Sequence, residues 1–276
     1  MAQIREIKKR MVAVASIARI TKTMQMIPNA KFAAAMVRAK AMRPFTQTIR
    51  HMVAEVAAAA GDIEHPLIRG PMESPKKELL LVISSDRGLC GAYNGHIFRV
   101  SGKYINEIKS SAKAFDIDIS GKKAVAFCKF RGIPVSNRYT FGDKPKFEEV
   151  NKLATRYIEE FTAGKYDAVR VAYMRFESNA RQIPEVMQLL PLKSPTAAAQ
   201  PTADAKAEVH QPKGNYEFSP SSEELLADLL PMTVKASLFQ AFNDAVVSEQ
   251  IMRMVAMKAA SDNARDLIDD LTLIYN

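Results

Sequence analysis

The sequence is poor in the residue types that build disulfide scaffolds and metal sites. Its 276 residues include two cysteines, Cys90 and Cys128, four histidines and no tryptophan. Two cysteines cannot cross-link a small scaffold, and histidines at positions 51, 65, 96 and 210 do not have the spacing of metal ligands. We therefore expect a reducing compartment, no structural metal and no cofactor.

Long apolar runs are also lacking. No stretch approaches the roughly 18 uncharged apolar residues of a membrane-spanning helix. Residues 4–10 are charged and amphipathic, whereas a secretory signal has an apolar core that ends in small residues. We expect a chain that neither spans a membrane nor carries such a signal. Its composition, 47% hydrophobic and 25% charged, is sufficient for one large or two small domains with a core.

Charge is distributed unevenly, although the formal net charge is +9. Residues 1–50 hold eleven basic side chains and one acidic side chain, whereas residues 221–276 hold nine acidic and four basic side chains. A basic arm is typical of proteins that bind nucleic acid, an acidic lipid surface or an acidic protein. The acidic C-terminal segment adds a fourth interpretation, in which the two ends of the chain pair with each other.

The N-terminal segment has the pattern of one long helix. Residues 2–60 are rich in Ala, Met, Lys and Arg, and apolar side chains recur at alternating steps of three and four. The stripe consists of Ile4, Ile7, Met11, Val14, Ala18 and Thr21, with a second row of Ile17, Ile20, Met24 and Ile27 beside it. Pro28 and Pro44 interrupt the pattern. We expect kinks rather than breaks, because a strongly helical composition resumes after each proline.

The C-terminal segment repeats this spacing. Serines 221 and 222 precede two glutamates, which is typical of a helix start. A later apolar row consists of Ala260, Ala264, Leu267, Leu271 and Ile274. A helix over 2–60 would extend roughly 80–90 Å, far more than a compact domain needs. Each stripe requires a partner, so we expect the two helices to pack as an antiparallel coiled coil.

The middle of the chain has the pattern of an α/β domain. Residues 78–84 form a continuous apolar run typical of a buried parallel strand, and a helix is predicted over 95–114. Further strands are predicted over 123–127, 135–139 and 168–176, with a helix over 146–163 between the last two. Strands that alternate with helices favour a layered α/β arrangement.

The predicted fold class is α/β plus coiled coil, with the α/β domain inserted between the two long helices. Residues rich in Pro, Ala and Ser precede the second helix and have the composition of a linker. The predicted divisions are 1–60 for the N-terminal helix, 61–192 for the α/β domain, 193–220 for the linker and 221–276 for the C-terminal helix.

Candidate catalytic groups are few. Residues 85–91 follow a strand and precede a helix, where α/β folds often bind a phosphate. Neither G-x-G-x-x-G nor G-x-x-x-x-G-K-[ST] occurs, so we interpret the segment as a tight turn. Cys90 would need a base, and only His96 is near in sequence, so we interpret it as a packed thiol.

Two acidic pairs have the spacing of carboxylate dyads. They are Asp116 with Asp118 and Asp269 with Asp270. Strand and helix spacing explains both pairs as solvated faces. We assign no catalytic residue, and the chain is expected to have no enzyme activity of its own.

Four segments resemble the gamma subunits of F-type ATP synthases, in the same order and over essentially the whole chain. They are Ile20-Thr21-Lys22-Thr23-Met24-Gln25-Met26, Ser84-Ser85-Asp86-Arg87-Gly88-Leu89-Cys90-Gly91, Gln188-Leu189-Leu190-Pro191-Leu192, and Ser248-Glu249-Gln250 with residues 253–263. That family is built as an antiparallel coiled coil of the two termini with an inserted Rossmann-like α/β domain. The resemblance thus implies the architecture that the hydrophobic pattern predicts.

The resemblance implies a central-stalk rotor. In this family the coiled coil stands inside a hexamer of alpha and beta subunits, and its base joins the epsilon subunit and the ring of membrane c subunits. Proton flow turns the ring and shaft, and the asymmetric shaft drives the beta sites through different affinities. The implied location is peripheral, on the cytoplasmic face of a bacterial inner membrane, with the matrix or stroma side of an organellar membrane as the alternative.

The resemblance also implies contacts with partner subunits. Lys8, Lys9, Arg10 and Lys22 are expected to contact acid-rich lever regions of the beta subunits, with Met24 close to the same contact. A merely solvated basic face is the alternative for these residues. The other expected contacts are Asp86, Arg87 and Arg253.

Three departures from the family pattern concern the ends of the chain and its cysteines. Pro28 stands where relatives carry a helix former. The family sequence continues past the position of Asn276 with helical residues that meet the catch loop of beta, so those contacts cannot be assigned. The inserted cysteine pair of photosynthetic relatives is absent, so redox regulation is not expected.

Two other functions remain open at this point. The basic arm and a pI near 9.4 favour a coiled-coil protein that binds nucleic acid, although the acidic C-terminal helix would neutralise that arm. The strand, glycine turn and helix around 85–91 favour an enzyme, although no acid and base constellation accompanies them.

Overall fold

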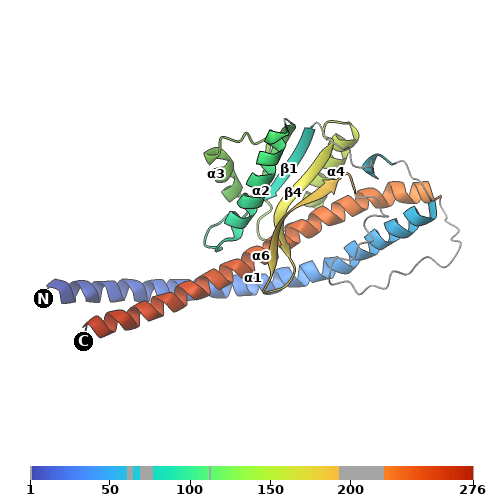
Figure 1. Ribbon diagram of the computed structural model, residues 1–276. Coiled ribbons are helices and arrows are strands. Elements are labelled where there is room, and N and C mark those ends of the chain that lie inside the picture. The colour runs from blue at the N-terminus through green and yellow to red at the C-terminus, as the bar shows by residue number, and fades with distance from the viewer. Residues whose placement is uncertain (1, 61–64, 69–76, 112, 193–220, 276) are drawn as a thin grey trace.

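The computed structural model describes residues 2–60, 65–68, 77–111, 113–192 and 221–275 (Figure 1). Two long helices form a shaft, and an α/β domain lies beside the part of it that is remote from the termini (Figure 1). The predicted linker lies outside the described residues. The division of the chain into domains stays a prediction.

The shaft consists of α1 and α6, which span Ala2–Ala60 and Ser222–Tyr275. The two helices run antiparallel, since both chain termini lie at the same end (Figure 1). α1 continues through Pro28 and Pro44, and α6 continues through Pro231. The predicted pair of long antiparallel helices is confirmed.

One row of α1 faces α6, rather than two. The half-buried positions in its first half include Ile7, Met11, Val14, Ala18, Thr21 and Met24, which are mostly the predicted stripe. Ile17, Ile20 and Ile27 are 51–57% exposed, so the predicted second row was wrong at these three positions. Each helix has only one neighbour in this part of the shaft, so a single row is covered.

The packed row of α6 is displaced from the predicted one. Ala264 is buried and Leu271 is half-buried, as expected. Leu267 and Ile274 are exposed, whereas the adjacent Ile268 is half-buried. A helix with 3.6 residues per turn drifts relative to an alternating count of three and four, which explains the displacement.

Opposite charges on the two helices meet at Arg43 and Asp244, where Arg43 opposes the rise in the pKa of Asp244 without forming an ion pair. Among the described residues, no ion pair links α1 with α6, and the polar bond between them runs from Arg50 Nη2 to Ser237 Oγ at 3.2 Å. The Arg10 guanidinium pairs instead with Glu6 on its own helix, at 2.7 Å. The interpretation in which the two ends of the chain pair with each other is confirmed, with apolar packing rather than ion pairs as the main contact between α1 and α6.

The α/β domain contains a five-stranded sheet in the order β3-β2-β1-β4-β5. Its strands are β1 Lys77–Ile83, β2 Ala114–Ser120, β3 Asn137–Tyr139, β4 Ala168–Phe176 and β5 Gln182–Leu190. β1, β2, β3 and β4 are parallel to one another, and β5 is antiparallel to β4. The first three strands and β4 therefore direct their carboxyl ends to the same edge of the sheet.

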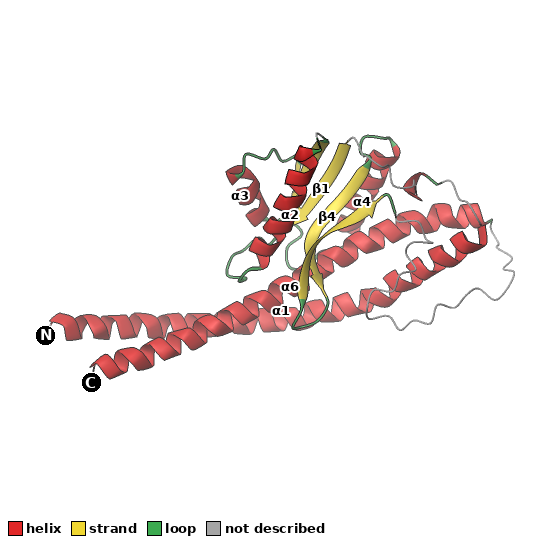
Figure 2. Cartoon of the chain, in the orientation of Figure 1, coloured by secondary structure: helices red, strands yellow, loops and turns green. Residues whose placement is uncertain are grey.

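Helices cover both faces of the sheet (Figure 2). α2 (Tyr93–Ser110) and α3 (Lys122–Phe130) pack on one face, where Leu80 and Val82 lie in the core. α4 (Phe147–Thr162) and α6 pack on the other face, where Leu79 and Leu81 lie. Burial on both faces explains why β1 reads as a continuous apolar run. A short 3-10 helix, η1 (Pro66–Ile68), also contributes Leu67 to this second core.

Secondary structure departs from the sequence prediction in three places. Residues 123–127 were predicted as a strand, but they lie in α3, where Ala124 and Cys128 are buried one helical turn apart. β2 and β5 were not predicted. β2 alternates Phe115, Ile117 and Ile119 with polar residues, a strand pattern that the prediction missed, whereas β5 is an edge strand with seven half-buried residues in succession.

Other boundaries shift by a few residues. The helix predicted over 95–114 is α2, which begins two residues earlier and ends four residues earlier. The strand predicted over 135–139 is limited to β3. The strand over 168–176 and the helix over 146–163 agree with β4 and α4 to within one residue.

Asp118 is the clearest error about an individual side chain. It was interpreted as solvated, but it is fully buried. It accepts hydrogen bonds from Asn137 Nδ2 at 2.9 Å and Tyr157 at 3.0 Å, and it pairs with Arg156. Buried charge requires such partners, and they come from β3 and α4. Asp269 and Asp270 are exposed, as predicted.

Among the described helices, α6 alone has a length and composition that would allow it to span a membrane. Its most apolar window has a mean hydropathy of 1.2. No stretch of 18 residues in α6 is free of charged side chains, so the expectation based on uncharged apolar runs stands. In this fold 56% of that window is buried. α6 is apolar because much of it packs against α1 and the α/β domain.

Candidate functional site

The turn after β1, residues 85–91, lies between the sheet and α6. Leu89 and Gly91 have positive φ angles of 61° and 57°. A Cβ atom on Gly91 would lie 3.6 Å from the Ala256 side chain on α6. The left-handed backbone favours glycine at this position, and the distance to Ala256 is that of ordinary van der Waals contact with the shaft. This agrees with the interpretation of the segment as a tight turn.

Asn94 on α2 holds the turn in place. Its Oδ1 accepts the Ser85 main-chain N–H at 3.1 Å, and its Nδ2 donates to Ser85 Oγ at 2.7 Å. Nδ2 also lies 3.2 Å from Cys90 Sγ. Cys90 is 2% exposed, and its described contacts are with Asn94, Ser85 and the Arg87 carbonyl rather than with His96. The residues around Cys90 supply no base, in agreement with its interpretation as a packed thiol.

Asp86 occupies the position where an α/β fold would bind an anion. Its Oδ1 accepts the main-chain N–H of Lys122 at 3.1 Å, at the start of α3. The adjacent Gly121 has φ of 96°, and a Cβ there would lie 2.2 Å from the Ser84 carbonyl oxygen. A carboxylate from the chain itself therefore neutralises the N-terminus of α3, whereas the helix that directly follows residues 85–91 is α2.

A small cavity of about 30 Å³ lies between this sheet edge and α6. Its lining includes three carboxylates, Asp86, Asp143 and Glu249, together with aromatic rings such as Tyr93 and Phe242. Sites for small ligands have volumes of about 300–1,000 Å³. The space suits roughly one water molecule, and its carboxylates would repel a phosphate. Among the described residues, no cluster of His, Cys, Asp and Glu is arranged to hold a metal.

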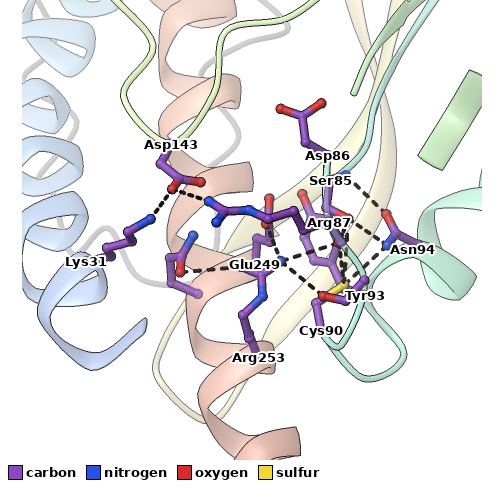
Figure 3. Close-up of polar contacts among 12 residues, drawn as sticks. Lys31, Ser85, Asp86, Arg87, Cys90, Tyr93, Asn94, Asp143, Glu249 and Arg253 are labelled. Atoms are coloured by element: carbon purple, nitrogen blue, oxygen red, sulfur yellow. Dashed lines mark hydrogen bonds and ion pairs between the residues drawn. The ribbon is translucent and has the colours of Figure 1, made fainter. Parts of the chain in front are cut away.

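Arg253 on α6 connects the shaft to the turn. Its Nη2 donates to Glu249 at 2.6 Å and approaches the carbonyl oxygens of Arg87 and Gly88 at 3.4 and 3.5 Å (Figure 3). Burial raises the pKa of Glu249, and Arg253 opposes that shift while Asp143 and Asp86 add to it. The buried guanidinium, 7% exposed, is thus matched by one carboxylate and two backbone carbonyls.

The expected contact residues form two separate groups. Asp86, Arg87 and Arg253 come together at the turn, and the Arg87 side chain is 65% exposed. Lys8, Lys9, Arg10 and Lys22 are exposed along the first half of α1, and Met24 is half-buried. Arg10 is separated from the turn by much of the free shaft, since about 20 helical residues extend roughly 30 Å.

Two further charged residues at this site were not predicted from the sequence. Asp143 in the loop after β3 pairs with Arg87 at 2.7 Å and with Lys31 on α1. Burial acts to raise the pKa of Asp143, but Lys31 and Arg87 hold it below its ordinary value. A loop acid and a helix lysine 112 residues apart have no local pattern that pairs them. Only the fold brings them together.

Comparison with known proteins places the whole chain in one group. A family model described as ATP synthase matches residues 3–276. The chain is 38% identical to the ATP synthase gamma chain of Rhodopirellula baltica over 100% of this chain and 92% of that one. It is 36% identical to the ATP synthase gamma chain of Brevibacillus brevis over 99% of this chain and 91% of that one.

Solved structures share the fold. A chain of the Euglena gracilis mitochondrial ATP synthase rotor matches with a TM-score of 0.65 and 18% identity, covering 100% of this chain and 96% of that one. A chain of the Tetrahymena thermophila mitochondrial ATP synthase central stalk and c-ring matches with a TM-score of 0.63 and 22% identity, covering 88% of this chain and 99% of that one.

Proposed function

The chain belongs to the family of ATP synthase gamma chains, and we propose that it couples rotation of a membrane c ring to conformational cycling of catalytic beta subunits. It is a subunit of the ATP synthase complex and has the architecture of a central-stalk rotor. The observation that carries the proposal is the shape: a two-helix shaft with free termini at one end and an α/β base beside the other (Figure 1).

The free end of the shaft is built to contact other chains. Its exposed apolar side chains include Ile4, Val12, Ile17, Ile20, Leu273 and Ile274, at 51–76% exposure. These side chains are distributed unevenly around two helices, so each orientation of the shaft presents a different surface. Differential contact of this kind is the physical requirement for a bound element to shift a neighbour between conformations.

The rotor acts without catalysing a reaction itself. The cavity at the sheet edge is too small for a nucleotide, and the Asp86 carboxylate occupies the start of α3 beside it. The thiol of Cys90 is packed against Asn94 and Ser85. These features support a chain that transmits rotation to catalytic sites on other subunits.

The proposed partners are alpha and beta subunits around the shaft, with the epsilon subunit and the c ring at the base. Lys8, Lys9, Arg10 and Lys22 would contact acidic lever regions of beta, with Met24 beside them. Asp86, Arg87 and Arg253 would form a second contact region near the turn, with Arg87 the most accessible of the three. Individual exposed ion pairs contribute only about 0–1 kcal/mol, so the group acts together.

The proposed location is the cytoplasmic face of a bacterial inner membrane, where the chain is peripheral and held through the complex. The curated relatives are bacterial gamma chains, which supports this location. The alternative function of binding nucleic acid is not supported, because the family assignment accounts for the basic arm and the acidic helix in one protein.

Co-assembly tests the proposal. The purified full chain is mixed with alpha and beta subunits of the same complex, and the stoichiometry and ATP hydrolysis of the product are measured. We expect one copy of the chain per hexamer and no hydrolysis by the chain alone. Nucleotide hydrolysis by the isolated chain, or a hexamer that excludes it, would contradict the proposal.

A further inference from the structure

Asp143 lies where three separate segments of the chain meet. Its Oδ2 accepts hydrogen bonds from Lys31 Nζ on α1 and from Arg87 Nη2 in the 85–91 turn, the latter at 2.7 Å (Figure 3). Its main-chain carbonyl lies 3.5 Å from Arg38 Nη2, also on α1. The Asp143 side chain is 26% exposed, so these bonds are partly shielded from water.

α1 has few other polar links with the α/β domain. Within the described part of the chain, it donates hydrogen bonds to that domain from Lys31, Arg38 and Arg43. The Arg43 bond ends on the Phe176 carbonyl at 2.8 Å, and the other two end on Asp143. Asp143 is therefore the main polar attachment of α1 to the domain.

The turn is attached on its other side to α6. Arg253 Nη2 approaches the carbonyls of Arg87 and Gly88, and the Arg87 guanidinium extends to Asp143. Polar contacts thus run from α1 through Asp143 and the turn to α6 (Figure 3). We name Lys31, Asp143, Arg87 and Arg253 the shaft clamp.

Directional hydrogen bonds fix the orientation of the α/β domain on the shaft in addition to apolar packing. The hydrophobic effect itself is non-directional, and interdigitated side chains supply part of the resistance to sliding. Charge-assisted hydrogen bonds have defined lengths and directions. Such bonds therefore add to the resistance of the packed domain against turning about the shaft axis.

We propose that Asp143 is a positioning residue that locks the α/β domain onto α1 and α6, so that base and shaft turn as one body. The effect of this locking on the coupling of proton transport to ATP hydrolysis rests on the proposed rotor function. The locking itself is a property of the isolated chain. The two parts are therefore tested separately.

The first test measures locking in the full chain. Asp143→Asn keeps the size of the side chain and removes the charge that Lys31 and Arg87 share. We expect amide hydrogen exchange in residues 85–91 to become about three- to fivefold faster, as the loss of a partly exposed ion pair would give. Asp143→Glu should restore slow exchange. Asp262→Asn is the matched control, since Asp262 pairs with Arg265 in an exposed site on a single helix.

Spin-label distances give a second measure of the same locking. Labels at Val37 on α1 and Phe130 on α3, 69% and 88% exposed, should give a broader distance distribution in Asp143→Asn than in the native chain or in Asp262→Asn. If Asp143→Asn does not fold, Lys31→Gln removes only the α1 arm and should also broaden the distribution. Native exchange and native distance widths in the folded variants would overturn the proposal.

The last test measures coupling in the assembled complex on membranes. Asp143→Asn should lower proton transport per ATP hydrolysed, while Asp143→Glu and Asp262→Asn retain the native ratio. A structural role alone would lower assembly without changing this ratio. If the native chain does not assemble, the proposed rotor function is contradicted. The amide hydrogen exchange of the isolated chain still tests whether Asp143 locks the domain onto the shaft. If assembly succeeds and the ratio is native in Asp143→Asn, the clamp has no part in coupling.

Discussion

The Tyr93 hydroxyl on α2 donates a hydrogen bond to the main-chain carbonyl of Ala245 on α6, at 3.2 Å. Tyr93 is 1% exposed. Burial raises the pKa of Tyr93 well above its ordinary value, with Glu249 contributing, so the hydroxyl stays a donor. This bond joins α2, which packs on one face of the sheet, to α6, which packs on the other.

Replacing Tyr93 by phenylalanine tests that attachment. The variant keeps the buried ring and loses one hydrogen bond, so we expect the free energy of unfolding to fall by about 1 kcal/mol. Urea denaturation followed by circular dichroism measures the change. Tyr275→Phe is the control, because Tyr275 is exposed near the end of α6 and should leave stability unchanged. Equal stability of the two variants would mean that the bond contributes nothing.

Asp118→Asn tests the buried ion pair of the sheet. The change removes the charge that faces Arg156 and the acceptor that Tyr157 uses, and we expect a loss of about 3 kcal/mol in the free energy of unfolding. Asp269→Asn, at an exposed position, should change stability by less than about 0.5 kcal/mol. Thermal and urea unfolding of both variants measure the difference. A small effect at Asp118 would show that Arg156 relaxes readily into water.

Asp244 on α6 predicts a dependence of stability on pH. Burial raises the pKa of Asp244 from 3.8 to about 6, although Gln240 and Arg43 oppose the shift. The folded state then binds more protons than the unfolded state between about pH 4 and pH 6, so this group lowers stability as pH rises through that range. Above pH 6 the buried charge of Asp244 therefore lowers the free energy of unfolding by roughly 3 kcal/mol.

Asp244→Asn should remove that contribution. Relative to the native chain, we expect the variant to gain stability as pH rises from about 4 to 6 and to keep the gain at higher pH. The measurement is the difference in free energy of unfolding between the two chains at each pH, which cancels groups with depressed pKa such as Asp116 and Asp143. A difference that does not vary with pH would contradict the assignment.

Charge reversal at Lys8, Lys9, Arg10 and Lys22 tests the proposed contact with beta subunits. All four side chains are exposed, so the isolated chain should keep its stability. In the complex we expect slower ATP synthesis and a weaker dependence of its rate on salt, because screened attraction between opposite charges is lost. Reversal of the exposed Lys103, Lys109, Lys129 and Lys152 on the α/β domain is the control. The same result from both sets would assign the effect to net charge.

Much of the fold follows from local pattern. The alternating three and four spacing and the rarity of glycine determine the long helices, and they also require a partner for each apolar stripe. The continuous run in β1 indicates a sheet covered on both faces. Motifs distributed along the whole chain are sufficient to identify the family. These features are local because helix periodicity and strand burial are visible within a few turns or a few residues.

The tertiary structure decided everything that depends on distant partners. Asp118 has the sequence pattern of a solvated residue, but β3 and α4 surround it in the fold. Residues 123–127 have the pattern of a strand, but they form a helix whose Ala124 and Cys128 pack into the core of the sheet. Ile17 and Ile20 remain exposed because a two-helix shaft covers only one row of α1. The meeting of Lys31, Arg87 and Asp143 has no local signal, since charged side chains find their partners through space.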